Sequence, residues 1–126
     1  METGLAEKEL IMAGTQLSEK GFTRVFTKEK HADKGAFYYP QTSMRFLSAD
    51  ELNKMNQTEL SIARNEIYAR HGRRFVNPFL HAVFSRKTWY KPRYEDTEFS
   101  GMVDQLFNEY EKENIKRLVA AEKELR

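Results

Sequence analysis

The sequence has no cysteine, only three prolines and six glycines, and a single tryptophan among its 126 residues. Without cysteine the chain has no disulfide bond, no thiolate metal ligand and no cysteine nucleophile, which suits a reducing compartment or a thiol-poor exported protein. No apolar run approaches the roughly 18 residues of a membrane-spanning helix. Residues 1–4 also lack the basic start and apolar centre of a signal peptide. We therefore expect a soluble chain with no membrane span.

Groups that could perform catalysis or bind a metal are also scarce. The three histidines are His31, His71 and His81, and none has the spacing of a metal-binding motif. There is no glycine-rich phosphate loop and no obvious pair of catalytic carboxylates. His71 falls at the end of a predicted helix, where the helix dipole favours a charged ring, which suits donating hydrogen bonds to carbonyls more than abstracting protons. The sequence favours a non-catalytic protein and predicts neither a metal site nor a cofactor.

Aromatic and charged residues, by contrast, are abundant. Nine phenylalanines, six tyrosines and the one tryptophan make up 13% of the chain, while 32% of residues are charged and the mean hydropathy is −0.76. Such a chain can bury a sizeable core and keep a well-solvated surface. Its length predicts one domain with an additional arm, because two domains of ordinary size would need more residues.

Charge is unevenly distributed along the chain. Residues 64–93 contain eight basic residues and one acidic residue, a net charge of +7, so the remainder carries −5 within a total of +2. The acidic ends can neutralise this basic stretch inside the fold, or the stretch can present a cationic face to an anionic partner. Both interpretations stay open, and internal neutralisation is favoured because several of the arginines fall on a predicted helix.

Residues 1–46 are interpreted as an N-terminal arm. Modest amphipathicity predicts a helix over residues 5–20, ended by Gly21. Residues 22–26 and 36–39 alternate apolar and polar side chains and are compatible with a short β-hairpin, although the intervening loop is longer than the common hairpin loops. Pro40 ends the second strand, and residues 41–45 form a connector.

The start of each later helix is marked by capping residues. Three pairs combine an N-cap side chain with a glutamate three residues later. They are Ser48 with Glu51, Asn56 with Glu59, and Asn108 with Glu111. Asn77 and Pro78 predict a further helix that runs to about Arg86, and apolar spacing over residues 99–106 predicts another short one. The fold class is therefore mainly α, with a compact multi-helix domain at residues 47–126.

A central helix running from near Asn56 to Gly72 organises this domain. At 100° per residue, apolar side chains cover both of its faces: Leu60, Ala63, Ile67 and His71 on one, and Ile62 and Ala69 on the other. A helix of this kind is surrounded by the rest of its domain, and buried polar groups without partners cost about 1–3 kcal/mol each. We therefore predict a structural network formed by Arg64, Asn65, Glu66, Tyr68, Arg70, His71, Gly72 and the core anchor Trp89. Glu66 and Arg70, four residues apart, are interpreted as a helix ion pair rather than as a catalytic acid with its electrostatic partner.

Residues beyond the central helix predict a binding surface. Cations here occur close to aromatic side chains, a combination that holds acidic polymers by charge and rings or bases by stacking. The predicted binding residues are Arg73, Arg74, Lys87, Tyr90, Lys91, Arg93 and Tyr94.

Residues 47–118 strongly resemble the YARHG domain, a bacterial family. Its name spells the residues that stand here as Tyr68-Ala69-Arg70-His71-Gly72. Further agreement comes from residues 63–67, Arg73, Phe75, the Trp89-Tyr90 pair and residues 111–115, and residues 37–46 are similar to the family's lead-in. The resemblance implies a mostly helical domain that is commonly attached to exported bacterial proteins, with no activity to carry over.

Two functions follow as expectations. The first is a non-catalytic binding module, extracytoplasmic by the resemblance, that recognises an anionic wall polymer, a glycan or a protein. The alternative is an intracellular, cytoplasmic regulator or nucleic-acid-binding protein that acts through the basic face and the arm at residues 1–46. A signal peptide or anchor upstream of Met1 would favour the first. Nothing in the sequence indicates an oligomeric state.

Overall fold

The helix α4, Gln57–Arg70, lies at the centre of the structure. The computed structural model describes residues 33–125. As predicted, the helix starts at its N-cap Asn56, whose side chain accepts the N–H of Glu59 while the Glu59 carboxylate accepts the N–H of Asn56. Most residues of α4 are buried, including apolar side chains on both of its faces. The central position expected from the two-sided apolar pattern is confirmed.

Short helices surround α4, and residues 33–125 contain no β-strand. They are η2 (Pro40–Ser43, a 3₁₀ helix), α3 (Ala49–Asn53), α5 (Pro78–Ser85), α6 (Asp96–Ser100), α7 (Val103–Leu106) and the longer α8 (Glu109–Glu124). The mainly helical fold class is confirmed. No helix among the described residues is both long and apolar enough to cross a membrane.

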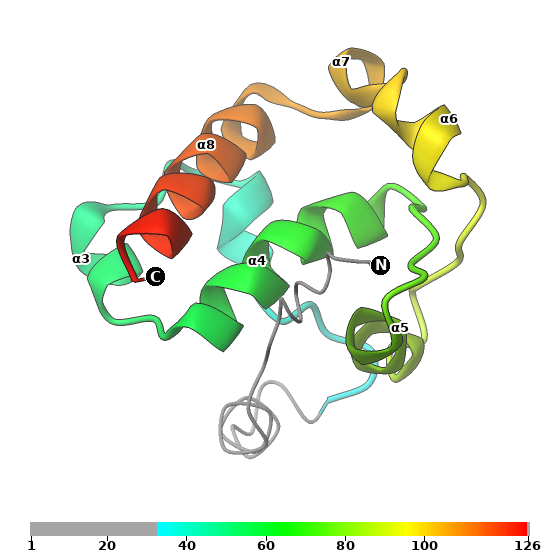
Figure 1. Cartoon of the computed structure of the whole chain (residues 1–126), viewed down its shortest axis with the longest axis horizontal. Coiled ribbons are helices and arrows are strands. Elements are labelled where there is room, and N and C mark those ends of the chain that lie inside the picture. The colour runs from blue at the N-terminus through cyan, green and yellow to red at the C-terminus, as the bar shows by residue number, and fades with distance from the viewer. Residues whose placement is uncertain (1–32, 126) are drawn as a thin grey trace.

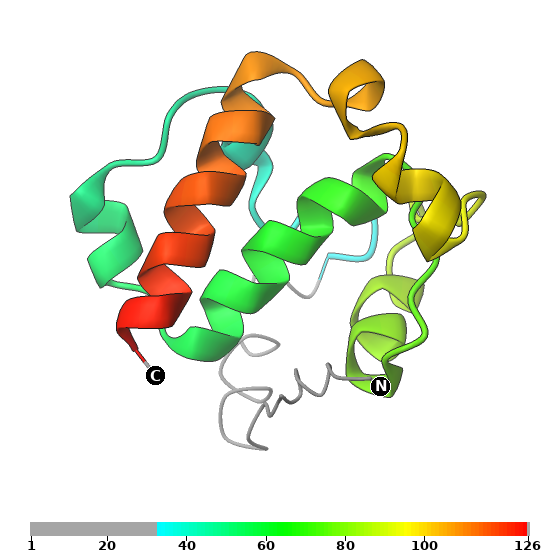
Figure 2. The same ribbon diagram turned by 45° about the horizontal axis from the view of Figure 1, so that its top comes forward.

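The helices α4 and α8 form the main packing layer. They lie side by side and run in opposite directions, and α3 is on the outer side of α8 (Figures 1 and 2). The helix α5 packs against α4. After α5 the chain passes through α6 and α7 and reaches the start of α8. The fully buried side chains between these elements include Leu60, Ile67, Val83, Phe84 and Leu118.

Capping explains most of the observed helix boundaries. The capping boxes of Ser48 with Glu51 and Asn108 with Glu111 form as predicted, and the Asn77 side chain caps α5. Residues 96–106 form two short helices where one was predicted, because α6 ends at Gly101 and α7 follows. An additional capping interaction, from the N–H of Glu95 to the Glu98 carboxylate, starts α6.

The β-hairpin is not supported by the structure. Its first strand, at residues 22–26, and the helix predicted over residues 5–20 lie outside the described residues. Residues 36–39 do not form a strand, because the N–H groups of Tyr38 and Tyr39 donate to the carboxylate of Glu66 on α4. The alternating pattern of residues 36–39 therefore arises from contact with α4 and not from pairing with a second strand.

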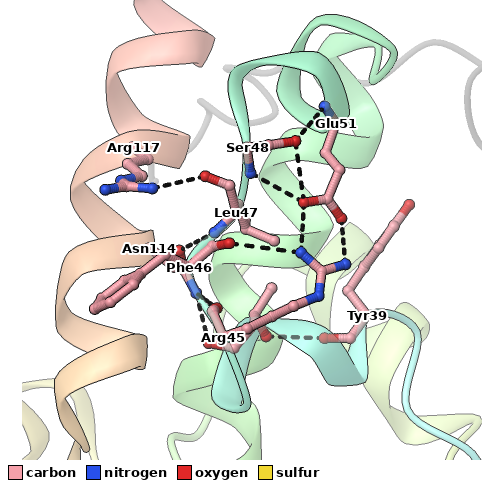
Figure 3. Close-up of polar contacts among 9 residues, drawn as sticks. Tyr39, Arg45, Phe46, Leu47, Ser48, Glu51, Asn114 and Arg117 are labelled. Atoms are coloured by element: carbon pink, nitrogen blue, oxygen red, sulfur yellow. Dashed lines mark hydrogen bonds and ion pairs between the residues drawn. The ribbon is translucent and has the colours of Figure 1, made fainter.

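Side chains from α8 hold the segment that leads from η2 into α3. The buried Asn114 accepts the N–H of Leu47 at 2.8 Å and donates to the carbonyls of Thr42 and Arg45 at 2.9 and 2.7 Å. Arg117 donates to the carbonyl of Leu47 at 2.7 Å (Figure 3). A segment without regular secondary structure is thus fixed by its backbone groups to a helix about 70 residues later in the chain.

Hydrogen bonds from Arg45 support the first turn of α3. Its guanidinium donates to both oxygens of Glu51, at 2.7 and 2.6 Å (Figure 3). These bonds hold the pKa of Glu51 to about 2. The carboxylate thereby stays ionised while it also accepts the N–H of Ser48.

Gly72 ends α4 in a left-handed conformation, with φ of +94°. Its N–H donates to Ala69, and its carbonyl accepts the N–H groups of Arg93 and Tyr94 at 2.8 and 3.0 Å. A Cβ atom at this position would lie 2.7 Å from Cγ of Arg93. Glycine is therefore required both by the backbone angle and by the close approach of the Arg93 side chain.

We predict that Gly72→Val lowers the free energy of unfolding by roughly 1–2 kcal/mol or more, because a β-branched residue is strained at positive φ. Urea denaturation measures the change. Gly101→Ala is the matched control, since Gly101 has φ of −79° and an added Cβ would come only into ordinary contact with Glu98. Equal stability of Gly72→Val and the wild type would contradict the assigned role of Gly72.

Candidate functional site

The Glu66 side chain is the centre of the polar network on α4. It is fully buried, and its carboxylate accepts the N–H groups of Tyr38 and Tyr39 at 2.5 and 2.8 Å. Arg70, one turn later, donates to the same carboxylate at 2.7 Å. The expected helix ion pair is present, and Glu66 also accepts hydrogen bonds from backbone outside its own helix.

Arg70 fastens η2 to the end of α4. Its guanidinium donates to the carbonyl of Tyr39 at 2.6 Å, to the hydroxyl of Thr42 at 2.8 Å and to the hydroxyl of Ser43. The guanidinium also lies over the ring of Phe37, 4.8 Å from its centroid. Since its side chain is only 8% exposed and used by these contacts, Arg70 acts as a structural residue.

His71 connects α4 to α8. Its Nε2 lies 3.0 Å from Oε1 of Glu111, whose other oxygen accepts the hydroxyl of Ser43 at 2.7 Å. Burial raises the pKa of Glu111, but hydrogen bonds from His71, the Asn108 N–H and Ser43 outweigh it, and the net shift is downward. The carboxylate stands between the hydroxyl and the imidazole, so the imidazole is not placed to activate Ser43 as it would in a catalytic triad.

The remaining predicted network residues also support the packing of α4. Arg64 pairs with Glu122 of α8 at 2.6 Å, and the buried Asn65 donates to the carbonyl of Ser61. Tyr68 stacks on Phe107, with ring centroids 5.7 Å apart. Trp89 packs against the core and donates from Nε1 to the carbonyl of Ala36, which agrees with its interpretation as a core anchor.

The predicted binding residues fall into three environments. Arg73 and Arg74 form ion pairs with Asp96 and Glu95 at the start of α6, both at 2.8 Å. Lys87 is buried: its ammonium donates to the carbonyl of Asp33 and lies over the ring of Tyr38, and burial lowers its pKa. The position of Lys87 removes it from any exposed cationic face.

Tyr90 is half-buried and donates its hydroxyl to the carbonyl of Arg73 at 2.7 Å. Lys91 and Arg93 are exposed, and neither forms an ion pair with a residue of the described part of the chain. With half-buried Tyr94, they border a pocket of about 220 Å³ at the end of α4. The complete lining is Arg70, His71, Gly72, Trp89, Lys91, Arg93, Tyr94 and Leu106. Residues that the sequence assigned separately to a structural network and to a binding surface thus meet in one place.

Within residues 33–125, no group of three or more His, Asp or Glu side chains is arranged to hold a metal ion. The family model described as the YARHG domain matches residues 35–123, most of the chain. The chain belongs to the YARHG domain family. No curated protein and no solved structure matches the chain.

The five letters of the YARHG name have distinct structural tasks in this chain. Tyr68 and Ala69 contribute to the core, Arg70 and His71 connect α4 to η2 and α8, and Gly72 permits the turn that follows. All five therefore contribute to the fold. The YARHG match begins at residue 35, and the domain boundary at residue 47 stays a prediction.

Sequence reasoning missed the partners that complete the structural network around α4. They are Tyr38, Tyr39, Thr42, Ser43, Glu111, Asn114 and Glu122. Asn114 could have been found from the sequence, because it lies in residues 111–115, one of the blocks that carry the family resemblance. The sequence evidence for the residues before α3 was weaker: they lie in residues 37–46, which are similar to the family's lead-in.

We predict that Glu66→Gln lowers the free energy of unfolding by roughly 3–5 kcal/mol, because it leaves the Arg70 charge buried without its partner. Glu113→Gln is the matched control, since Glu113 and Arg117 form an i,i+4 pair on α8 whose side chains are more than a third exposed. That variant should change stability by less than about 1 kcal/mol. Denaturant unfolding of both variants gives the comparison, and equal effects would contradict the structural importance of Glu66.

A second prediction concerns Glu111. Its folded-state pKa is lowered, so its contribution to stability is present above the unfolded pKa of about 4.3 and is lost as the pH falls through the folded value. Glu111→Gln should therefore be less stable than the wild type near pH 5, with the difference shrinking toward pH 3. Thermal unfolding over this pH range tests the expectation. A difference that does not change with pH would show that the carboxylate charge is unimportant.

Proposed function

We propose that this YARHG domain is a non-catalytic binding module that recognises an anionic partner, a polymer or a protein, outside the bacterial cytoplasm. Membership of the family supports the location, because YARHG domains are often extracytoplasmic. The binding surface consists of Arg73, Arg74, Lys91, Arg93 and Tyr94, and we call it the basic surface. Lys87 is not part of it, because its side chain is buried.

The observation that carries the proposal is the state of Lys91 and Arg93. Four other cations of the basic stretch, Arg64, Arg70, Arg73 and Arg74, each pair with an acidic side chain. Lys91 and Arg93 form no such pair with a described residue, and they lie two residues apart in the segment between α5 and α6. Both line the same pocket at the end of α4, so the two charges act on the same space.

Arg73 and Arg74 can extend this surface although they are paired. Their partners, Asp96 and Glu95, are 64% and 61% exposed, and the side chain of Arg74 is itself half exposed. Exposed ion pairs contribute only about 0–1 kcal/mol, so an acidic partner can compete with Glu95 for Arg74 at little cost. The Arg73 side chain is 26% exposed and lies over the rings of Tyr68 and Phe75, so it stays in place while its exposed partner Asp96 can be displaced.

Ring positions favour an acidic polymer or protein over nucleic acid. Binding of single-stranded nucleic acid relies on exposed aromatic faces that stack on successive bases. Here Trp89 packs edge-on to Phe37 and bonds Ala36, and Tyr90 is held by the carbonyl of Arg73. Of Trp89, Tyr90 and Tyr94, only Tyr94 has a polar side-chain atom without a described partner. One such ring does not make a stacking platform.

We predict that the full chain binds polyglutamate and polyphosphate but not neutral dextran. Binding should weaken steeply between about 10 mM and about 150 mM salt, as the Debye length falls from ~30 Å to ~8 Å. The double variant Lys91→Gln/Arg93→Gln should lose most of this binding at unchanged stability, because both side chains are exposed. Biolayer interferometry measures the affinities.

The matched control is Lys116→Gln/Lys123→Gln on α8, which removes the same charge from two exposed lysines elsewhere on the surface. This control should retain nearly all of the wild-type affinity. Equal losses in both double variants would mean that net charge alone governs the binding. In that event, or if neither polyanion binds, the basic surface is not a recognition site.

A further inference from the structure

The pocket at the end of α4 collects residues from three separate parts of the chain. Arg70, His71 and Gly72 come from the end of α4, and Leu106 comes from α7. The loop after α5 contributes Trp89, Lys91, Arg93 and Tyr94. No carboxylate lines it. Its composition therefore differs from that of the surrounding surface, where Asp96 and Glu95 face Arg73 and Arg74.

The charges of the pocket do not cancel. Arg70 is balanced by Glu66 and His71 is paired with Glu111, whereas Lys91 and Arg93 have no described acidic partner. The negative end of the α4 dipole is also covered, because the carbonyls of Tyr68 and Ala69 accept N–H groups from residues 71–73. The pocket is thus a cationic recess whose positive charge is not offset by the helix end.

The size of the recess limits what can enter it. At about 220 Å³ it is smaller than the ~300–1,000 Å³ pockets that hold drug-sized ligands, so it has room for one compact unit. An extended peptide would need free backbone groups to pair with. Here the carbonyls of Gly72 and Tyr94 and the N–H groups of Arg93 and Tyr94 are already bonded to each other or to Arg74. A small ring fits this site better than a peptide strand.

We infer that this pocket binds a single sugar-sized unit that carries one oxyanion group, a phosphate or a carboxylate. Lys91 and Arg93 hold the oxyanion, and the side chains of Trp89, Tyr94 and Leu106 contact the C–H face of the ring. The hydroxyl of Tyr94 has no described partner and donates to a ring oxygen. This inference rests on the proposed function and specifies which part of an anionic polymer the domain recognises.

The test is a titration of the ¹⁵N-labelled full chain with glucose 6-phosphate, glucuronate, glucose and inorganic phosphate. The two anionic sugars should cause saturable shifts centred on the amides of Gly72, Arg93 and Tyr94. Glucose should cause none, and phosphate should bind more weakly than glucose 6-phosphate because it lacks the ring. Equal affinities for phosphate and glucose 6-phosphate, or shifts spread over other cations, would overturn the inference.

Variants separate the pocket from the basic surface around it. Leu106→Trp fills the recess without changing charge and should abolish binding of the anionic sugars, whereas Val76→Trp, at an 84% exposed position, should leave it unchanged. Lys91→Gln should weaken binding at least about tenfold, because it removes a charge-assisted hydrogen bond to the oxyanion. If Leu106→Trp melts at a lower temperature than the wild type, Tyr94→Phe is the deciding variant. It removes only one hydroxyl and should weaken binding of the anionic sugars.

Failure of the inference is distinguishable from failure of the proposed function. If polyglutamate and polyphosphate bind through Lys91 and Arg93 but no sugar shifts the pocket amides, the pocket assignment is wrong and the basic surface stands. If Leu106→Trp or Tyr94→Phe binds the anionic sugars as well as the wild type does, the pocket assignment is also wrong. If neither the polymers nor the sugars bind, both proposals are wrong.

Discussion

The structure depends on the burial of one carboxylate, that of Glu66. Removing a charge from water is costly unless donors replace the lost hydration, and here two backbone N–H groups and Arg70 do so. The same contacts satisfy the N–H groups of Tyr38 and Tyr39, which have no strand to pair with. Helix α4 therefore acts as a template for the segment before it, and Arg70 extends the template to η2. The polar groups of the interior thus specify where an irregular segment lies.

Short-range signals predicted the helices well. Capping side chains at Ser48, Asn56 and Asn108 set the starts of three helices, and Gly72 set an end, because each acts within a few residues of itself. Residues 36–39 could not be assigned in this way. Their alternation has the same form for a strand and for a segment lying on a helix, and Glu66, 28 residues away from Tyr38, decides between the two. A partner so far away in the sequence cannot be predicted from the pattern of neighbouring residues.

The candidate site was predictable only in part, because composition does not indicate which charges are neutralised. Lys91 and Arg93 remain available, whereas Arg73 and Arg74 meet acids from α6 and Lys87 is directed into the interior. The helical wheel predicted the network on α4. It did not predict that His71 and Gly72 would line the same pocket as Trp89 and Tyr94 of the loop after α5. Both interpretations of the basic stretch hold for different residues: internal neutralisation for most of its arginines, and exposed charge for the segment around Pro92.

The close approach of Arg93 to Gly72 has an entropic consequence. A flexible arginine loses up to ~2 kcal/mol of rotamer entropy when it is immobilised, and this loss normally weakens binding. The Arg93 side chain already lies against the bare Cα of Gly72, and its backbone is bonded to the Gly72 carbonyl. This contact, at Cγ, Cδ and Nε, restricts the rotamers of the side chain, although the residue is exposed. The glycine at the end of the family motif thus limits the conformations of a cation that lies 21 residues later in the chain.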